Sequence, residues 1–578
     1  MTNHATNSAP PGWKRTERPL RIALLGWARL SFQGSQGSGY NLSASELAAG
    51  LAMSGHEVSY LASGRRYDLR PRMRIAATER WRGIECFDLF NSPNVSPASY
   101  NFQNMAVETS HPGQTRLVVS WLASRSIQVV HVHSLEGFPL ELIGAIRDAG
   151  MPVIVTPHNY WYACPQVDLM QDEVRICRDY EGGRKCEGCI RSRPASSARL
   201  KRRFGQTFEA LVGQGVSSLA RRAGKEIPDR IRELIGRLPP EMPNAREPDP
   251  EIALGFDAGE SDGLIRHNFV AERGDGRRKP VGSTSIDENE SFLRADHHLQ
   301  VLNQYGRRRV DGVAALNHAS LVIPPSDFVR RVYVRMGLDE SRGRVVRLGQ
   351  PHFDQINRRA RRSPYYGVRP WDPRTARRPL RFGFFGAMRP SKGIDVLCEA
   401  IPLLPPAIRQ RCQFHIRAQG YDWPLRKKLS FYPEVSFSGG YDLLQLIGAG
   451  NEYDVGILPH VWFENSPLVL LEHLHAGKFV VSSRLGGPVE WIHPPANGML
   501  IPGGQPAHLA EAIGSLVSGE VAVPSPREIH EATPILQSYP GHIAQVEGIY
   551  REALGLPPEA ATAAPEVVTT ARAVSSPR

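Results

Sequence analysis

The sequence predicts an α/β protein made of two doubly wound parallel sheets, and three observations lead to this prediction. The chain has 578 residues, whereas a single hydrophobic core stops growing at about 250–300 residues. Apolar runs of strand length alternate with segments of helical periodicity, which is the order typical of a doubly wound sheet. The alternation is interrupted once and begins again near residue 381, so we expect two α/β domains.

The first alternation starts after a polar, proline-containing stretch of 18 residues, which predicts a disordered tail. RIALLGW then predicts a buried strand, and a glycine-rich stretch follows it at 32–40. Residues 41–55 place apolar side chains at helical spacing, with Gly55 as the stop. Three further strands are predicted at HEVSYLAS, QVVHVHS and PVIVTPHN, with the helix-like segment LELIGAIRDAG between the last two.

The alternation breaks at about residues 195–290, which are rich in Arg, Pro, Asp and Gly. This composition predicts an insertion with some helix and much loop. The sheet pattern resumes at 318–328 and 344–354, so we expect the N-terminal domain to cover residues 19–354. A basic, proline-containing stretch at 355–379 predicts a linker.

The second alternation is the clearer one. RFGFFGA predicts a strand, and residues 392–404 predict the helix after it. Further strands are expected at QFHIRAQG, EVSFSGG, YDVGILPH, KFVVSS and GMLIPGG, with helices at YDLLQLIGAG and PLVLLEHLHAG. We therefore expect a C-terminal domain over residues 380–556, followed by a disordered tail at 557–578.

Two glutamates mark the segment FENSPLVLLEHLHAG in this second domain. Glu464 lies at the start of the predicted helix and Glu472 lies inside it, about 12 Å away at 1.5 Å per residue. A glycosidase needs its two carboxyl groups within about 5–9.5 Å, so this pair suits the two ends of an elongated ligand better. The positive end of the helix suits a diphosphate. The alternative is an ordinary amphipathic helix with two solvated glutamates.

The boundaries of that helix are also predicted. Asn465 or Ser466 can cap a helix that begins at Pro467, because proline is favoured in the first turn. Gly477 can end it.

The same segment resembles a known family. YDVGILP, ENSPLVLLEHLHAGKFVV and LGGPVE are similar to the Glu-x7-Glu region of glycosyltransferase family 4, a retaining family of the GT-B fold. GAMRPSKGIDVLCEA and NGMLIPGG resemble two further elements of that family. His473, His475 and Phe479 depart from its usual residues, but both carboxylates are kept. The resemblance covers roughly residues 20–190 and 295–550, and implies two Rossmann-like domains facing across a cleft.

The resemblance also implies roles for individual residues. Arg389 and Lys392 would bind the donor diphosphate, where cations stabilise the charge that develops as it leaves. Glu464 would hold the sugar and Glu472 the ribose. The remaining donor-binding residues implied are Gly37, Gly39, Asn465, Ser466, Pro467 and Leu468.

His158 in TPHNYW resembles the active-site histidine of the family, placed to bond a sugar hydroxyl. The alternative is a histidine at a strand end that bonds to the backbone. His131 and His133 are interpreted as structural.

Four of the seven cysteines, Cys164, Cys177, Cys186 and Cys189, fall within 26 residues. Four thiolates, two of them in a C-x2-C pair, suit a tetrahedral zinc ion. Such an ion would be structural and would brace the loop that follows His158. A subset of family 4 enzymes is similar here, although that likeness does not specify a metal. The alternative is a set of reduced or redox-labile thiols.

The net charge of +12 includes basic clusters at 191–203, 358–362 and 374–381. Such clusters attract phosphate groups, including those of an anionic bilayer, or they form a solvated surface. The chain has no apolar run of about 18 residues and no secretory signal pattern, so we expect a cytoplasmic protein, with peripheral contact at the inner membrane face. The sequence does not support a nucleic-acid-binding protein, because it has no helix-turn-helix or zinc-finger motif and no aromatic residues interleaved with basic ones.

The resemblance therefore implies a retaining transferase that moves a sugar from a nucleoside diphosphate sugar to a glycan or a lipid-linked acceptor, in polysaccharide or glycoconjugate biosynthesis. No catalytic divalent metal is expected, because cations and helix amides take its place. Two alternatives stay open: an epimerase or phosphorylase-type enzyme on the same fold, and a non-catalytic GT-B protein that binds sugar nucleotides or glycans.

Overall fold

The computed structural model describes most of the chain between residues 13 and 557. The described residues are 13, 15–31, 39–70, 72–171, 175–190, 194–212, 288–294, 301–420, 423–440, 452–533 and 535–557. The predicted tails lie largely outside them, as do most of the predicted insertion and the helix expected at YDLLQLIGAG. No helix within the described ranges is long and apolar enough to cross a membrane.

The first sheet has seven strands in the order β3-β4-β2-β1-β5-β6-β9. They are β1 (Arg21–Gly26), β2 (Glu57–Arg66), β3 (Arg74–Trp81), β4 (Ile84–Phe90), β5 (Val129–Val132), β6 (Val153–Val155) and β9 (Leu321–Val322). All neighbours pair in parallel except β3 and β4. The strands predicted at RIALLGW, HEVSYLAS, QVVHVHS and PVIVTPHN are present as β1, β2, β5 and β6. The β3–β4 hairpin was not predicted, because β3 is a half-exposed edge strand without an apolar run.

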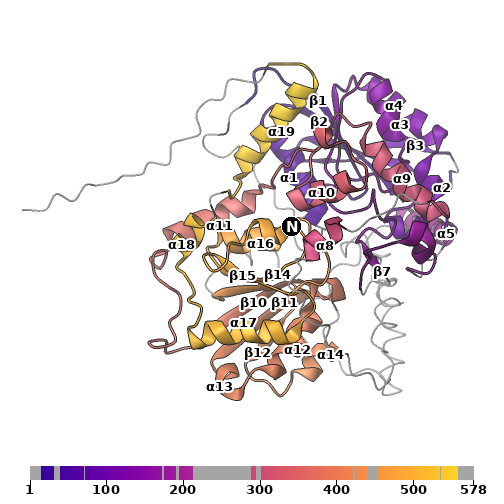
Figure 1. Cartoon of the computed structure of the whole chain (residues 1–578). Helices are drawn as coiled ribbons and strands as arrows, with labels where there is room; N and C mark the ends of the chain where they lie inside the picture. The colour runs from indigo at the N-terminus through magenta and orange to yellow at the C-terminus, as the bar shows by residue number, and fades with distance from the viewer. Residues whose placement is uncertain are drawn as a thin grey trace, which may run out of the picture.

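The second sheet has six strands in the order β12-β11-β10-β13-β14-β15, and all of them are parallel. They are β10 (Leu380–Ala387), β11 (Cys412–Gln419), β12 (Val435–Ser438), β13 (Val455–Leu458), β14 (Phe479–Ser483) and β15 (Gly498–Ile501). A small antiparallel pair, β7 (Met170–Gln171) and β8 (Arg175–Ile176), lies in the loop after β6. Figure 1 shows the two large sheets one above the other. The predicted fold class is confirmed.

Helices cover both sheets. Around the first are α1 (Gly39–Met53), α2 (Ala106–Thr109), α3 (Pro112–Ser124), α4 (Leu142–Asp148), α5 (Ala195–Val212), α8 (Glu288–Arg294), α9 (Gln304–Leu316) and α10 (Asp327–Arg335). Around the second are α12 (Ile394–Leu403), α13 (Pro406–Arg409), α14 (Trp423–Lys428), α16 (Leu468–His475), α17 (Pro506–Ser518) and α18 (Pro526–Glu531). Side chains cap several of them, such as Asn303 on α9 and Ser326 on α10.

The region between the sheets differs from the prediction. Residues 344–350 form no strand, and helix α11 (Pro351–Arg362) occupies the start of the stretch predicted as a linker. Proline in the first turn and arginines in the last turn both favour this helix. The arginines that suggested a linker thus belong to a helix whose Phe353 and Ile356 are buried.

The last helix, α19 (Tyr539–Ala553), packs on the first sheet rather than the second. Its residues Ile543, Val546 and Tyr550 share a core with Ile22 and Leu24 of β1. Figure 1 shows this yellow helix beside the indigo strands. The chain therefore crosses from the second sheet back to the first at its end. The domain boundaries given above stay a prediction.

Candidate active site

The predicted two-glutamate helix is α16, which follows β13 after a short loop. Gly477 ends it with a φ of +63°, as expected for a left-handed stop. The predicted side-chain cap is wrong: Pro467 occupies the capping position and no side chain bonds there. The Asn465 amide instead donates a hydrogen bond to the carbonyl of His158. The residue expected to cap the helix thus ties it to the other half of the molecule.

Glu464 and Lys392 form an ion pair at the start of this helix. The distance from the Lys392 Nζ to the Glu464 Oε1 is 2.5 Å. The glutamate side chain is 7% exposed and the lysine side chain 34% exposed. Burial raises the pKa of Glu464, but Lys392 and His460 outweigh it, so the net shift is downward. The site therefore holds a fixed carboxylate with a cation that solvent can reach.

Two glycines allow this close approach. Gly393, next to Lys392, has a φ of +72°, and an added Cβ would lie 1.8 Å from the Pro459 carbonyl. Gly486 has a φ of +76°, and its Cβ would lie 2.0 Å from the Glu464 carbonyl. Gly486 and Glu464 also form an isolated parallel bridge. Only glycine fits such contacts, so the loop that carries Glu464 is held between two glycine turns.

Glu472 lies inside α16 and is 5% exposed. Its Oε1 is 3.0 Å from the Nε2 of His352, which α11 supplies. His352 lies within residues 344–354, where the sequence predicted a continuation of the sheet. Its contact with Glu472 could therefore not be predicted.

Buried polar atoms without a hydrogen-bond partner gather at α16. Within the described part of the chain, these include the Asn465 Oδ1, the Ser466 Oγ and the Glu472 Oε2. Buried polar groups normally have partners, because leaving one unpaired costs about 1–3 kcal/mol. The Asn465 Oδ1 and the Glu472 Oε2 can therefore accept hydrogen bonds from the hydroxyl groups of a polar ligand, and the Ser466 Oγ can accept or donate one.

His158 follows β6 in the first sheet, and its carbonyl is the partner of the Asn465 amide just before α16. Its Nε2 is 3.0 Å from the Nδ1 of His133, and the two rings stack. Tyr40 of α1 also contacts the His158 ring, with ring centroids 5.7 Å apart. Burial, helped by the charge of His542, lowers the pKa of His158 to about 3. The ring is therefore neutral near pH 7, and its orientation is fixed by its neighbours.

The two neighbouring histidines differ from each other. His131 bonds to Tyr550 at 2.6 Å and to Thr156 at 2.8 Å, which fits the structural interpretation. His133 also has a buried position, but it bonds to His158 directly. His133 follows β5 and His158 follows β6, and the two strands are neighbours in the sheet. This strand order could not be predicted from the sequence.

Contacts across the two halves hold the loop before α16. Phe463 packs between Phe292 and Phe328, with ring centroids 4.7 Å and 5.0 Å away. Its carbonyl accepts a hydrogen bond from the Tyr160 hydroxyl at 3.1 Å. Asn289 of α8 bonds to both the N–H and the carbonyl of Gly486. The loop before α16 is thus part of the contact between the two halves of the molecule.

The N-terminus of α1 also reaches α16. A Cβ on Gly39 would lie 3.6 Å from the Leu468 side chain, so the starts of the two helices meet. Gly37 lies outside the described residues. Arg389 precedes the short 3-10 turn η5 (Pro390–Lys392) and is half-buried, in the same turn as Lys392.

The structure does not support the predicted zinc site. Cys164, Cys177, Cys186 and Cys189 are all buried and line one small cavity. However, the described residues contain no group of three or more His, Cys, Asp or Glu side chains that could hold a metal ion. Arg309 lies among the sulfurs instead, 3.9 Å from the Cys177 Sγ. Burial raises the pKa of Cys186 to about 11.

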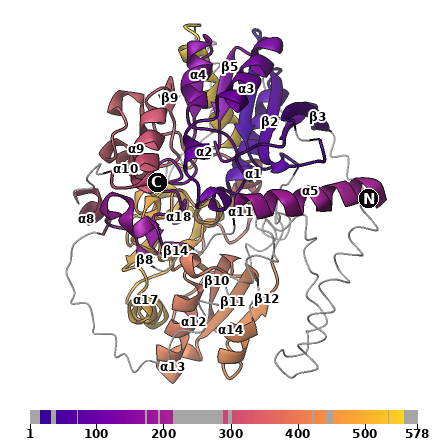
Figure 2. The same ribbon diagram turned by 90° about the vertical axis from the view of Figure 1, so that its right-hand side faces the viewer.

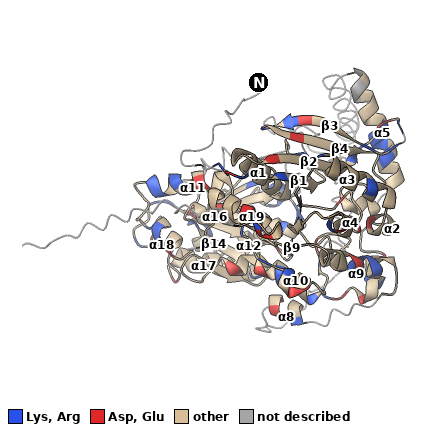
Figure 3. Cartoon of the chain, turned by 90° about the horizontal axis from the view of Figure 1, so that it is seen from above, with Lys and Arg blue, Asp and Glu red and all other residues tan. Residues whose placement is uncertain are grey.

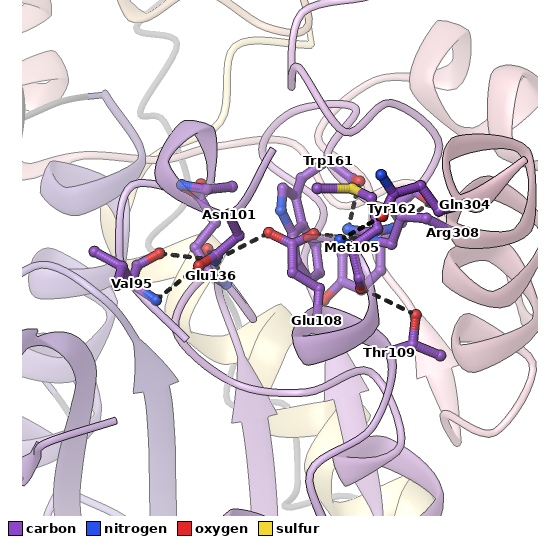
Figure 4. A network of polar contacts seen from close by, with 12 residues as sticks. Val95, Asn101, Met105, Glu108, Thr109, Glu136, Trp161, Tyr162, Gln304 and Arg308 are labelled. Atoms are coloured by element: carbon purple, nitrogen blue, oxygen red, sulfur yellow. Dashed lines mark hydrogen bonds and ion pairs between the residues drawn. The ribbon is translucent and has the colours of Figure 1, made fainter. Parts of the chain in front are cut away.

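Sequence reasoning also missed a buried ion pair behind the His158 loop. The Arg308 Nε of α9 lies 2.8 Å from the Glu108 Oε2 of α2, and the two side chains are 0% and 1% exposed. Figure 4 shows Arg308 also bonding to the carbonyls of Trp161 and Tyr162, which follow His158. Because arginine and glutamate are common on helix surfaces, nothing in the sequence marked this pair.

Two family models match different parts of the chain. A model of the glycosyl transferase 4-like domain matches residues 38–219. A model described as glycosyl transferases group 1 matches residues 379–519, which include Lys392, Glu464 and Glu472. A search of curated proteins finds no match.

Similar solved structures have low sequence identity. Sucrose-phosphate synthase from Thermosynechococcus elongatus is 14% identical, with a TM-score of 0.51 over 93% of this chain and 99% of that chain. Trehalose 6-phosphate synthase from Burkholderia multivorans is 10% identical, with a TM-score of 0.49 over 93% and 98%. HepE from Anabaena, solved with UDP-glucose, is 12% identical, with a TM-score of 0.48 over 92% and 99%. The two matched domains show that this chain is a glycosyltransferase, and its fold is of the GT-B type.

Proposed function

We propose that the protein is a retaining glycosyltransferase that moves a sugar from a nucleoside diphosphate sugar to a glycan or lipid-linked acceptor. The observation that supports this most is the ion pair between the buried Glu464 and the partly exposed Lys392 at the start of α16. A fixed carboxylate can accept hydrogen bonds from sugar hydroxyls. A lysine with three donors can pair with Glu464 and still reach a phosphate oxygen.

In the proposed mechanism the donor lies along the start of α16. Lys392 and Arg389 stabilise the departing diphosphate, together with the amides of α16. Glu464 holds the sugar, and Glu472 accepts a bond from the ribose. Neutral His158 accepts or donates a hydrogen bond to a sugar hydroxyl from the opposite side. Asn465, Ser466, Pro467, Leu468, Gly37 and Gly39 complete the proposed donor site.

The transfer breaks the bond between the anomeric carbon and the diphosphate oxygen. The acceptor hydroxyl attacks from the face that the diphosphate leaves, and its proton passes to the departing phosphate. The configuration at the anomeric carbon is therefore kept. We place the protein in the cytoplasm, in contact with the inner membrane face where a lipid-linked acceptor would be found.

A thermal-shift panel tests the donor. UDP, GDP, ADP and their sugars are compared on the wild type, Glu472→Gln and Glu434→Gln. Glu434 is a matched control, because it is also a largely buried carboxylate but pairs with Arg409 at 3.6 Å, away from α16. One nucleotide series should stabilise the wild type and the control by about 2.7 kcal/mol at 100-fold excess over Kd. The Glu472→Gln variant should lose this gain.

A missing shift with every nucleotide would exclude the transferase proposal and favour a non-catalytic glycan-binding protein. Once a donor is found, the anomeric proton in the product's NMR spectrum reports the stereochemistry. An inverted product would rule out the retaining mechanism. Phosphate-dependent cleavage without nucleotide would instead indicate a phosphorylase.

A further inference from the structure

Helix α5 carries a row of apolar side chains that the rest of the described structure leaves exposed. Leu200 is 55% exposed, Phe204 62%, Phe208 47% and Leu211 80%. They follow one another at spacings of four, four and three residues, so they lie on one face of the helix. We call these four residues the apolar face of α5. Exposed apolar side chains gathered in this way mark an interaction site.

The opposite face of the same helix is fixed to the body of the protein. Ala198 is 5% exposed. The Arg202 Nη1 donates to the Gly64 carbonyl at 2.8 Å, and the Gln206 Nε2 donates to the Arg65 carbonyl at 2.9 Å. These bonds attach α5 to the end of β2 and turn the apolar face outward. Figure 2 shows α5 extending sideways past the sheets, at the level between them.

The charges of α5 are strongly positive. The helix contains Arg199, Lys201, Arg202 and Arg203, against a single carboxylate, Glu209. At 3.6 residues per turn, Lys201 lies about 60° to one side of the apolar face and Arg203 about 100° to the other. Figure 3 shows the blue segments of α5 at the edge of the molecule. Cations therefore border the apolar face on both sides.

We propose that α5 lies in the surface of an anionic bilayer, with its apolar face inserted at the level of the headgroups. A helix with aromatic and leucine side chains on one face and lysine and arginine beside them is the form that binds such surfaces. Long cationic side chains at the border reach lipid phosphates while the apolar face enters the acyl boundary. A nucleic acid would use the cations but not the apolar row, and a protein groove would need no net positive charge.

This inference names the surface for the membrane contact in the proposed function, but it does not depend on the donor site. α5 belongs to the half of the molecule that holds His158. Binding through α5 would therefore hold that half against the bilayer. A lipid-linked acceptor would then meet the enzyme from the membrane plane.

Vesicle flotation of the full chain tests the proposal. Vesicles of equal parts phosphatidylglycerol and phosphatidylcholine are compared with vesicles of phosphatidylcholine alone. The wild type should float with the anionic vesicles, and the double variant Phe204→Ser/Leu211→Ser should bind at least about tenfold more weakly. Lys201→Gln should weaken binding by about fivefold. The matched control is Leu403→Ser/Phe431→Ser, which removes two apolar residues exposed by 56% and 88% elsewhere, and it should bind like the wild type.

Three results would overturn the proposal: no flotation of the wild type, equal binding to neutral vesicles, or an equal loss in the control. A dimer in sedimentation velocity that Phe204→Ser/Leu211→Ser abolishes would assign the face to a second copy instead. Nucleotide thermal shifts on the same variants separate the two proposals. A variant that keeps its nucleotide shift but no longer floats supports α5 as the membrane surface. Flotation through α5 without any nucleotide shift would sink only the donor proposal.

Discussion

At the scale of single residues, the pairing of Glu464 with Lys392 has a measurable effect on stability. Lys392→Met removes the cation that lowers the pKa of Glu464 and leaves a buried carboxylate unpaired. Losing one partner of a fully buried pair costs about 3–5 kcal/mol, but the lysine is one-third exposed, so we expect about 1–2 kcal/mol.

The measurement is the free energy of unfolding from urea denaturation without nucleotide. The pKa of Glu464 is lower in the folded protein than in the unfolded chain. The pair therefore stabilises the protein above the unfolded pKa of the glutamate, and this stabilisation is lost as pH falls through the folded pKa. The difference between wild type and Lys392→Met should therefore shrink at acid pH. A difference that stays constant down to low pH would contradict the pairing.

Gly486 gives a second prediction at this scale. Gly486→Ala would place a methyl group 2.0 Å from the Glu464 carbonyl, so the loop that carries Glu464 must move. A displacement of about 1 Å at a reacting centre can cost about 100-fold in rate, and we expect a loss of this order in kcat. Transfer assays with a donor found in the thermal-shift panel measure it.

Gly555 is the control for this substitution. It also has a positive φ, +66°, but an added Cβ would meet nothing within 4 Å. Gly555→Ala should therefore cost only the backbone strain of about 1 kcal/mol in stability and leave the rate unchanged. Equal rate losses in both variants would contradict a specific role for the Gly486 turn.

At the scale of elements, the Glu108–Arg308 pair joins α2, α9 and the loop after His158. Glu108→Leu or Arg308→Met alone leaves a buried charge without its partner, so each should cost about 3–5 kcal/mol. The double variant Glu108→Leu/Arg308→Met should cost less than the sum, because no unpaired charge remains. A double-mutant cycle from denaturation curves gives the coupling energy. Additive costs would show that the pair contributes little.

Sequence reasoning succeeded best for elements with a strong pattern. The strands around YDVGILPH and KFVVSS are buried runs, and the structure contains them as β13 and β14. It failed where polar composition hid a buried face, as in α11, and where an edge strand lacked an apolar run, as in β3. Residues near each other in sequence, such as Lys392 and Arg389, could be grouped in advance. Partners that meet only through the fold, such as His352 with Glu472 or His133 with His158, could not.

At the scale of the whole molecule, buried histidines make stability depend on pH. Burial lowers the pKa to about 3 or 4 for five of them: His158, His473, His475, His530 and His542. Below pH 6.5 the unfolded chain binds protons that the folded chain does not, so stability is complete above about pH 6.5 and falls as pH drops toward the folded pKa values.

Each such histidine contributes a loss of about 1.4 kcal/mol per pH unit in that window. With five of them, we expect acid unfolding to begin well above pH 4. Denaturation midpoints measured from pH 8 down to pH 4 test this. His473→Gln and His475→Gln, which keep a polar group in place, should each flatten the slope. A flat profile between pH 7 and pH 5 would contradict the expected neutral state of these rings.

The position of α19 sets the order in which the protein can be completed. Its residues belong to the core of the first sheet, although they are synthesised after every strand of the second sheet. Domains usually fold as units from the N-terminus during translation. Here the core of the first sheet cannot be completed until all residues of the second sheet have been synthesised. For the same reason, a chimaera that exchanges C-terminal halves between related enzymes would replace part of the N-terminal core as well, unless the exchange ends before Tyr539.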